Sequence, residues 1–307
     1  MKILSKFAGF FRTKKYIIGF FNSEEYLPLK QTGTRDIKWL DLNGYSEGWF
    51  ADPFILSING SCIHVLVEEF LYSKHKGRIS CLTINRSNDE YILKEVKPIL
   101  ELDTHLSFPN VFREEGRVYI CPENFQSGKV ILYEFDEKKL EVKTSYVLLN
   151  EPLVDVQVVK NNGFYYALGT PTVTGEMDET KHLNVYKSNL LTGEYKLFCS
   201  IDNNKKEERG AGAIYVTDFQ LIRPIQCCEG RYGKEVIFRT LSITDKNVLQ
   251  AEILRLKPKT YKKWGLALHT YNWYEGLSVV DGQDYVRVIP VSRVIDPLIR
   301  KLSSLKH

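Results

Sequence analysis

Apolar and polar residues alternate with a period of two along most of the chain, in short runs that end at Gly, Asn or Asp. This pattern is typical of half-buried β-strands joined by tight turns. The clearest example covers residues 105–135, where a turn containing Gly116 separates two alternating runs and a break at Pro122 precedes a third. The sequence therefore predicts an antiparallel β-meander in this segment.

The central part of this segment, an apolar run followed by a turn and a second strand, recurs along the chain. Four further copies are residues 52–67 with a turn at Asn59-Gly60, residues 155–168 with a turn at 161–163, residues 213–223 with a turn at Thr217-Asp218, and residues 277–289 with a turn at Asp281-Gly282. The copies lie roughly 45 to 65 residues apart, the interval at which four-stranded blades recur in propellers. We predict an all-β fold, a five-bladed β-propeller over residues 35–290.

Both ends of the chain mix basic and apolar residues, and we predict short basic amphipathic extensions there. They are residues 1–34 and residues 291–307, the second of which is expected to form a helix. Segments of this kind bind anionic membrane surfaces, with about 1 kcal/mol from each Lys or Arg near the surface. The alternative is that residues 1–21 form a first strand or helix docked on the propeller. Because no apolar run has the length of a signal-peptide core or a membrane span, we expect a cytoplasmic protein, peripheral on the inner face of the cytoplasmic membrane.

Composition narrows the classes of function. The chain has 18 Tyr, 16 Phe and 4 Trp, and aromatic side chains pack on sheets and also bind sugar rings. The net charge is only +4, and basic residues are interleaved with acidic ones, which argues against nucleic acid as a partner. The six cysteines lack metal-ligand spacing and indicate free thiols in a reducing compartment. No acidic pair of the DxD type is present, so we predict no metal and no cofactor.

Three carboxylates come from similar places in successive repeats, and we take them as the candidate catalytic residues: Asp52, Glu123 and Asp155. Equivalent positions of a propeller converge on one axial opening. Glycosyl transfer and glycoside hydrolysis both need carboxylates near the anomeric carbon, one to move a proton and one to stabilise positive charge. The alternatives are structural: Asp52 would cap a turn, and Glu123 would satisfy a loop.

Polar and aromatic residues of the same segments are candidate substrate contacts: Trp49, Glu69, His105, Asn124, Arg209, Arg223, Gln226, Tyr232, His269 and Asn272. The two arginines suit a diphosphate or an acidic sugar, because a guanidinium binds such groups with two N–H donors, although Arg223 has the alternative of pairing with a blade carboxylate. Successive strand residues point to opposite faces, and the sequence leaves open whether Glu68 or Glu69 faces the pocket. For both histidines a structural role is the alternative.

Several of these elements together resemble a known family. They are Trp49–Phe54, His105–Pro109, Cys121–Glu123, Val154-Asp155, Arg223–Gln226 with Tyr232-Gly233, and His269–Asn272. In this order they resemble the N-terminal domain of plant glucosamine inositolphosphorylceramide transferases and the bacterial proteins that carry this domain in surface-polysaccharide gene clusters. More remotely, the repeat resembles five-bladed hydrolases of the arabinanase and invertase type, which place two Asp and a Glu around the funnel. The sequence departs from these hydrolases because Ser107-Phe108 stands where the second Asp is expected.

The resemblance implies a carbohydrate-active enzyme. We expect a glycosyltransferase of bacterial surface polysaccharide assembly, such as O-antigen or capsule, that uses an activated nucleotide sugar as co-substrate and a glycan or lipid-linked acceptor. One alternative is a furanosidase-like glycoside hydrolase. A second is a non-catalytic propeller that binds sugar.

Overall fold

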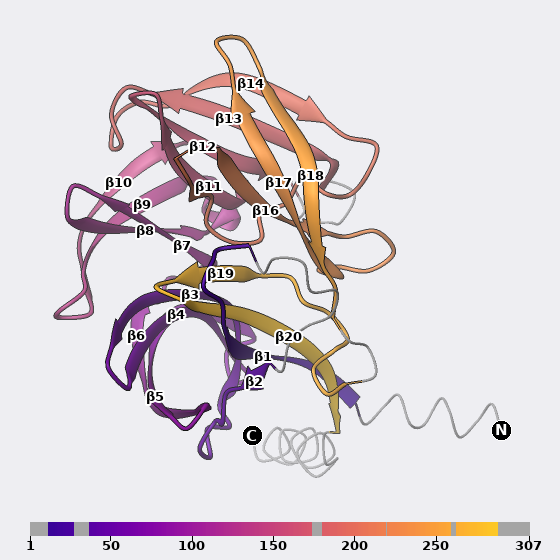
Figure 1. Cartoon of the computed structure of the whole chain (residues 1–307). Helices are drawn as coiled ribbons and strands as arrows, with labels where there is room; N and C mark the ends of the chain where they lie inside the picture. The colour runs from indigo at the N-terminus through magenta and orange to yellow at the C-terminus, as the bar shows by residue number, and fades with distance from the viewer. Residues whose placement is uncertain (1–11, 28–36, 174–179, 219, 259–261, 288–307) are drawn as a thin grey trace, which may run out of the picture.

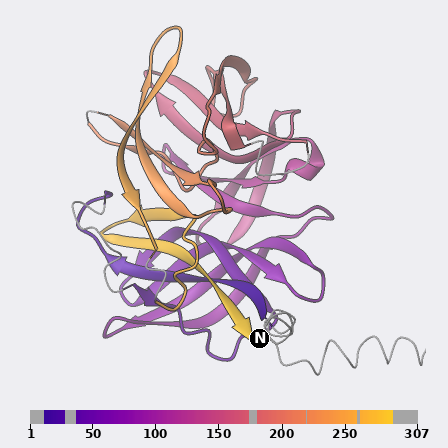
Figure 2. The ribbon, with the colours of Figure 1, turned by 90° about the vertical axis from the view of Figure 1, so that its right-hand side faces the viewer.

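The expected five-bladed β-propeller is confirmed by a computed structural model, which describes residues 12–27, 37–173, 180–218, 220–258 and 262–287. In these residues the strands form five antiparallel sheets of four strands each. Figures 1 and 2 show the five sheets as separate blades. The six cysteines are free thiols, and no helix of the described residues is long and apolar enough to cross a membrane.

Four blades are built from consecutive strands. Blade one contains β3 (Gly48–Asn59), β4 (Cys62–Leu71), β5 (Lys76–Ser87) and β6 (Glu90–Leu100), and blade two contains β7 (Ser107–Glu114), β8 (Arg117–Glu123), β9 (Val130–Asp136) and β10 (Glu141–Leu149). Blade three contains β11 (Leu153–Asn161), β12 (Phe164–Pro171), β13 (His182–Ser188) and β14 (Lys196–Asp202), and blade four contains β15 (Tyr215–Val216), β16 (Leu221–Cys227), β17 (Glu235–Ile243) and β18 (Val248–Leu256). A 3-10 turn, η1 (Phe125–Ser127), follows β8.

Blade five joins the two ends of the described chain. Its strands are, in order, β19 (Tyr271–Tyr274), β20 (Leu277–Arg287), β1 (Arg12–Asn22) and β2 (Lys38–Trp39). The indigo strand β1 and the yellow strand β20 lie side by side in Figure 1 and pair over their full length, from Arg12 with Arg287 to Asn22 with Leu277. Pairing of the first strand with the last closes the ring and places both strands in the middle of the blade.

This closure corrects the expected division of the chain. Residues 12–22 belong to blade five, so the predicted extension over residues 1–34 contains a propeller strand. The predicted turn at Asp281-Gly282 is also wrong, because β20 runs through both residues and the turn lies at Glu275-Gly276, where φ is +46° and +82°. Gly282 allows close packing there, since a Cβ would lie 2.4 Å from the ring of Trp39. The predicted C-terminal helix, residues 291–307, lies outside the described residues.

Burial along the strands decreases from the inside of a blade to the outside. The residues of β11 are almost all buried, whereas most residues of the outermost strand β10 are partly or fully exposed. The strand β11 alternates apolar residues with Asp155 and Gln157 and is still covered on both faces, so its polar side chains are buried inside the propeller. The apolar core lies between neighbouring blades; one cluster combines Phe20 of blade five with Phe50 and Val65 of blade one.

The inner strands of blades one, two and three share an irregularity at equivalent positions. The register of each strand with its neighbour shifts at Asp52, Phe108 and Asp155, and these residues have φ of +49°, +42° and +48°. A bulge with a left-handed residue bends a strand and redirects the side chain at that point. The repeat predicted from sequence is therefore present in the backbone, with Phe108 at the position that carries an Asp in the two neighbouring blades.

Candidate active site

Residues from all five blades line one cavity of about 330 Å³: Tyr16, Trp49, Asp52, Glu68, His105, Ser107, Glu123, Phe125, Val154, Arg209, Tyr232 and His269. Tyr16 comes from β1 of blade five, Asp52 from β3 of blade one, Glu123 from β8 of blade two and Val154 from β11 of blade three. Arg209 lies in the segment that leads into blade four. The cavity thus lies where the blades converge, and it combines several ionisable groups with aromatic walls.

Asp52 is held by groups from two other blades. The Thr270 hydroxyl donates to its Oδ1 at 2.6 Å, and the Phe108 amide donates to its Oδ2 at 3.2 Å. The side chain is nearly inaccessible to water, and burial raises the pKa of Asp52 to about 7 although the nearby His269 cation lowers it. Near neutral pH this carboxyl group therefore exists in both protonation states.

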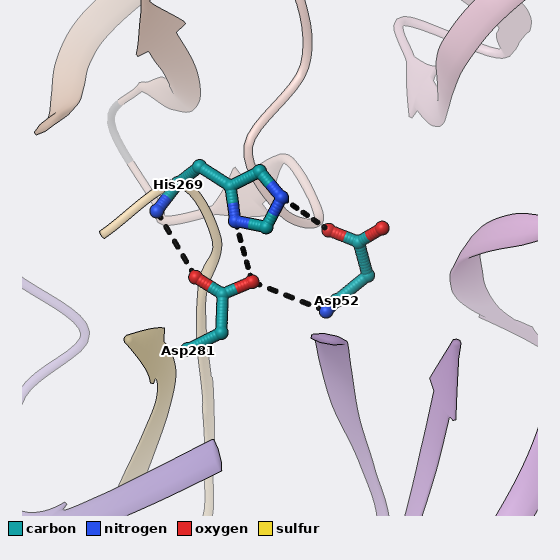
Figure 3. A group of neighbouring side chains, drawn as sticks. All are labelled: Asp52, His269 and Asp281. Atoms are coloured by element: carbon teal, nitrogen blue, oxygen red, sulfur yellow. Dashed lines mark hydrogen bonds and ion pairs between the residues drawn. The ribbon is translucent and has the colours of Figure 1, made fainter. Parts of the chain in front are cut away.

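His269 lies between two carboxylates, as Figure 3 shows. Its Nδ1 is 2.6 Å from Asp281 Oδ2, and its Nε2 is 3.7 Å from Asp52 Oδ1. Burial lowers the pKa of His269, but the charges of Asp281 and then Asp52 more than offset this and raise the pKa to about 9. The ring of Tyr16 stacks on the imidazole with the ring centroids 4.8 Å apart. At neutral pH the imidazole is therefore a fixed cation beside Asp52.

Asp281 anchors this group. It is fully buried on β20 and accepts backbone hydrogen bonds from His269 at 3.0 Å, Thr270 at 3.0 Å and Asp52 at 3.2 Å. Among the described residues, Asp52, His269 and Asp281 are also the group whose composition fits a metal ion, with their ligand atoms within 4.8 Å of one another. Each of the three already has protein partners, so a cation would have to displace contacts that hold the blades together. The absence of a metal stays a prediction.

Glu123 and Arg209 form the other charged centre of the cavity. The Nη2 of Arg209 donates to Glu123 Oε2 at 3.0 Å, and its Nε donates to Asp155. Burial raises the pKa of Glu123 to about 8, although the Arg209 charge lowers it. Arg209 also lies over the ring of Tyr232, 5.1 Å from its centroid. Glu123 is therefore a protonated carboxyl group at neutral pH, next to a guanidinium whose charge is already paired.

Asp155 lies behind Arg209 and is not among the residues that line the cavity. Gln226 lies next to it, and its amide donates to Asp155 Oδ2 at 2.9 Å and to the Gly210 carbonyl at 2.7 Å. The expected direct roles of Asp155 in catalysis and of Gln226 in substrate contact therefore need correction. Both residues hold the Arg209 guanidinium and its segment in place.

The structure settles the choice between Glu68 and Glu69. Glu68 lines the cavity, whereas Glu69 is fully buried on the opposite face of β4. Glu69 accepts hydrogen bonds from the Tyr45 hydroxyl at 2.6 Å and from Arg78 Nε at 2.7 Å. The predicted substrate contact of Glu69 is therefore wrong, because its carboxylate is used to join strands.

Three more predicted contacts do not lie in the wall of the cavity. Arg223 is fully buried and pairs with Glu208 at 3.1 Å, which is the carboxylate pairing considered as the alternative. Asn272 ties blades together, because it accepts from the Ala213 amide and donates to the Pro53 carbonyl, both at 2.8 Å. Asn124 is buried at the start of η1 and is not among the residues that line the cavity. None of the three side chains reaches a substrate in the cavity as predicted.

The remaining predicted contacts lie in the wall of the cavity: Trp49, His105, Arg209, Tyr232 and His269. Sequence reasoning missed Tyr16, which was assigned to the extension, and Asp281, which was assigned to a turn. The short apolar run from Tyr16 to Phe21, rich in β-branched and aromatic residues, was the available signal for a strand. No local signal distinguishes the function of Asp281, since its contacts join residues far apart in the sequence.

A sequence profile of the family described as "Glucosamine inositolphosphorylceramide transferase 1, N-terminal" matches residues 38–272. A glucosamine inositolphosphorylceramide transferase 1 of Oryza sativa subsp. japonica is 29% identical over 198 residues, which are 63% of this chain and 26% of the rice protein. The Arabidopsis thaliana protein of the same name is 28% identical over 209 residues, which are 66% of this chain and 27% of the Arabidopsis protein. The chain thus spans about a quarter of the length of these relatives, and the resemblance predicted from sequence is confirmed.

Solved structures with a similar fold include an exo-β-1,3-galactanase of Phanerochaete chrysosporium with galactose. Its TM-score is 0.54 at 12% identity, and the match covers 72% of this chain and 54% of the galactanase. An α-L-arabinofuranosidase of Clostridium thermocellum has a TM-score of 0.50 at 13% identity. The match covers 80% of this chain and 92% of the arabinofuranosidase. At these identities the likeness establishes the propeller fold alone.

Proposed function

The chain belongs to the family of the N-terminal part of glucosamine inositolphosphorylceramide transferase 1, and from this premise we propose that it is a carbohydrate-active enzyme that transfers a glycosyl group. The observation that carries the proposal is the pair Asp52 and Glu123 in the wall of one cavity, with pKa values raised to about 7 and about 8. Acid–base catalysis is most efficient when the pKa of the group lies near the working pH. Most glycoside hydrolases use two carboxyl groups at the anomeric carbon, one of them an acid with a raised pKa.

Glu123 is the general acid in this proposal. Because its carboxyl group is protonated at neutral pH, it can give a proton to the oxygen that leaves the anomeric carbon. The Arg209 guanidinium, which donates to Glu123 Oε2 at 3.0 Å, stabilises the carboxylate that forms. Asp155 contributes through Arg209 and does not touch the sugar.

Asp52 stabilises the positive charge that develops on the sugar ring. Its two oxygens are fixed by Thr270 and Phe108, and the adjacent imidazolium of His269 favours the ionised carboxylate. Such a preorganised negative group does not have to reorient as charge develops. The aromatic side chains of Trp49 and Tyr232 supply apolar faces for the ring of the sugar.

The donor in this proposal is an activated sugar, and its glycosyl group occupies the cavity. The Arg209 charge in the wall is paired with Asp155, and Arg209 also donates to Glu123, which is protonated near neutral pH. The oxygen that leaves the anomeric carbon lies next to Glu123 in this proposal, and the rest of the diphosphate extends from there. Arg223 is buried and paired with Glu208, so it does not bind the diphosphate as the sequence predicted.

We extend the proposal to the assembly of a surface polysaccharide, with a glycan or a lipid-linked acceptor at the cytoplasmic face of the membrane. The support is the resemblance of the cavity-forming segments to bacterial proteins of surface-polysaccharide clusters, together with the transferase names of the plant relatives. Of the basic ends that would contact an anionic membrane, Lys14 and Lys15 lie in β1 of blade five, whereas residues 1–11 and 288–307 lie outside the described residues.

A binding measurement tests the proposal. The melting temperature is recorded with UDP-glucose, UDP-galactose, UDP-N-acetylglucosamine and GDP-mannose, and release of nucleotide is followed with methyl glycosides as acceptors. A ligand at a hundredfold excess over its dissociation constant adds about 2.7 kcal/mol to the stability of the folded state. We expect one donor to stabilise the protein and to be consumed. Stabilisation without consumption would support a binding propeller instead.

Hydrolysis is the competing reaction for the same carboxyl groups, with water in place of the acceptor. The position equivalent to Asp52 and Asp155 in blade two carries Phe108, so the residues depart from the two-Asp pattern of the hydrolases that the repeat resembles. Release of free sugar from arabinan or galactan oligosaccharides, with no consumption of nucleotide sugars, would decide for the hydrolase.

A further inference from the structure

A second carboxylate and imidazole pair faces the cavity. His105 Nε2 lies 3.2 Å from Glu68 Oε1, and the His105 side chain is 30% exposed. Glu68 comes from β4 of blade one and His105 from the segment before β7 of blade two, so the pair bridges two blades. Both residues line the same cavity as Asp52 and Glu123.

The backbone assigns the tautomer of His105. The Gly77 amide donates a hydrogen bond to Nδ1 at 3.0 Å, so Nδ1 is an acceptor and the proton of the neutral ring is on Nε2, which points at Glu68. The backbone amide of His105 is fixed in turn by Gln126 Oε1 at 2.9 Å. With both ring nitrogens engaged, the imidazole donates to Glu68 and does not itself accept a proton from a substrate.

Gly77 provides the space for the pair. A Cβ at this position would lie 2.9 Å from Glu68 Oε1, 2.9 Å from His105 Cε1 and 2.5 Å from the Leu106 carbonyl oxygen. These separations are too short for a carbon atom, and the backbone carbonyl cannot move easily. Any side chain at residue 77 would therefore push the two groups apart, which shows that the local backbone is fitted to the pair.

Glu68 differs from Asp52 in the use of its second oxygen. Both oxygens of Asp52 accept hydrogen bonds from the protein, one from Thr270 and one from Phe108. Within the described part of the chain, the contact of Glu68 is the one between Oε1 and His105, and Oε2 is left for a group in the cavity. Of these two carboxylates, Glu68 is the one with an oxygen available to receive a proton.

We propose that Glu68 is the general base that activates the acceptor hydroxyl, and that His105 is the positioning residue that orients it and stabilises its charged form. The proposal rests on the proposed glycosyl transfer. The acceptor hydroxyl gives its proton to Glu68 Oε2, and its oxygen forms the bond to the anomeric carbon. The bond from this carbon to the leaving oxygen breaks with its electron pair, and the leaving oxygen takes the proton of Glu123. Solvent exchange then returns Glu68 and Glu123 to their starting states.

The test compares kcat and KM of the full chain and its variants on the donor that the wild type consumes fastest among UDP-glucose, UDP-galactose, UDP-N-acetylglucosamine and GDP-mannose. General base catalysis contributes about 10²- to 10⁴-fold, so Glu68→Gln should lower kcat by at least about 100-fold. His105→Asn and Gly77→Ala should lower kcat by smaller factors with little change in KM. His182→Asn is the matched control, because His182 pairs with Asp202 on the exposed surface of blade three.

Chemical rescue separates a base from a structural carboxylate. Sodium formate should raise the kcat of Glu68→Ala at least tenfold, because a small carboxylate can occupy the vacated space. It should leave the kcat of Glu69→Ala unchanged. If the wild type is active and Glu68→Gln keeps kcat within threefold, or formate restores nothing, the role of Glu68 is wrong and the transfer activity stands. If the wild type consumes none of the four donors, the proposed function fails and the base assignment fails with it.

Discussion

The carboxylate of Asp281 accepts a hydrogen bond at 3.2 Å from the backbone amide of Asp52, a residue 229 positions away in the sequence. The bond connects β20 of blade five with the bulge of β3 in blade one, next to the point where the ring closes. The same carboxylate holds the His269 ring at 2.6 Å. One buried carboxylate therefore links blades five and one and places both the Asp52 backbone and the His269 ring beside it.

Replacement of this group should destabilise the fold. In Asp281→Asn the His269 cation loses its nearest counter-charge inside the protein, and removal of one partner of a buried ion pair costs about 3–5 kcal/mol. Urea unfolding followed by tryptophan fluorescence should show a lower midpoint with an unchanged slope. A midpoint equal to that of the wild type would mean that Asp281 does not hold blades five and one together.

Asp52→Asn should abolish turnover and leave the fold intact. Asn tolerates the φ of +49° at this position, and its Oδ1 can accept from the Phe108 amide while its Nδ2 donates to the Thr270 hydroxyl oxygen. We expect the free energy of unfolding at pH 6 to fall by no more than about 1 kcal/mol, which shifts the melting temperature by about 2–4 °C. A large loss of stability would make the residue architectural, and retained turnover would remove it from the mechanism.

The same substitution should change how stability depends on pH. The pKa of Asp52 is raised from 3.8 to about 7 in the folded protein, so between these values the folded state keeps a proton that the unfolded chain has released. The contribution of Asp52 to the free energy of unfolding is therefore complete below about pH 4. It falls by at most about 1.4 kcal/mol per pH unit as the pH rises to about 7.

Because Asn does not titrate, Asp52→Asn should gain stability relative to the wild type between pH 4 and pH 7. Urea unfolding at these two values, with the exposed Asp245→Asn as the control, measures the difference. If the free energies of unfolding of Asp52→Asn and the wild type differ by the same amount at pH 4 and pH 7, folding does not raise the pKa of Asp52.

Glu68 and Glu69, neighbours on β4, should respond differently to substitution. Glu69→Ala removes the partner of Arg78 and of the Tyr45 hydroxyl. Because these groups are then unpaired, the free energy of unfolding should fall by about 3 kcal/mol or more. Glu68→Gln should change stability by less than about 1 kcal/mol. Differential scanning calorimetry of both variants tests this, and the reverse order would exchange the assigned roles.

Much of the fold was predictable, because blade repeats leave local signals. Alternation located most inner strands, and turns such as Asn59-Gly60 mark hairpins that the structure contains. Closure was not predictable from local pattern, since β1 pairs with a strand at the opposite end of the chain. For the same reason Asp281-Gly282 was read as a turn. The dipeptide favours one, and the Gly in a strand is explained by close packing against the Trp39 ring and the Trp264 carbonyl.

The site was predictable in its residue types and less so in its contacts. Asp52 and Glu123 were found because polar groups at equivalent strand ends converge in a propeller, and His269 was found from the polar and aromatic composition of its segment. Arg223 and Glu69 have the same chemistry as true cavity residues, but their partners Glu208 and Arg78 use them inside the blades. Which member of such a pair faces the cavity depends on register and bulges, and these are set by contacts between strands rather than by composition.

The most direct test of the central claim is the pH dependence of kcat for the wild type, Asp52→Asn and Glu123→Gln on one consumed nucleotide sugar. The wild type should lose activity as the pH rises through about 8, because Glu123 then loses the proton it must donate. Glu123→Gln should lower kcat by at least about 100-fold and abolish this alkaline decrease, and Asp52→Asn should be inactive at every pH. If both variants keep kcat within threefold of the wild type with the same profile, the two carboxyl groups in the cavity do not carry out the reaction.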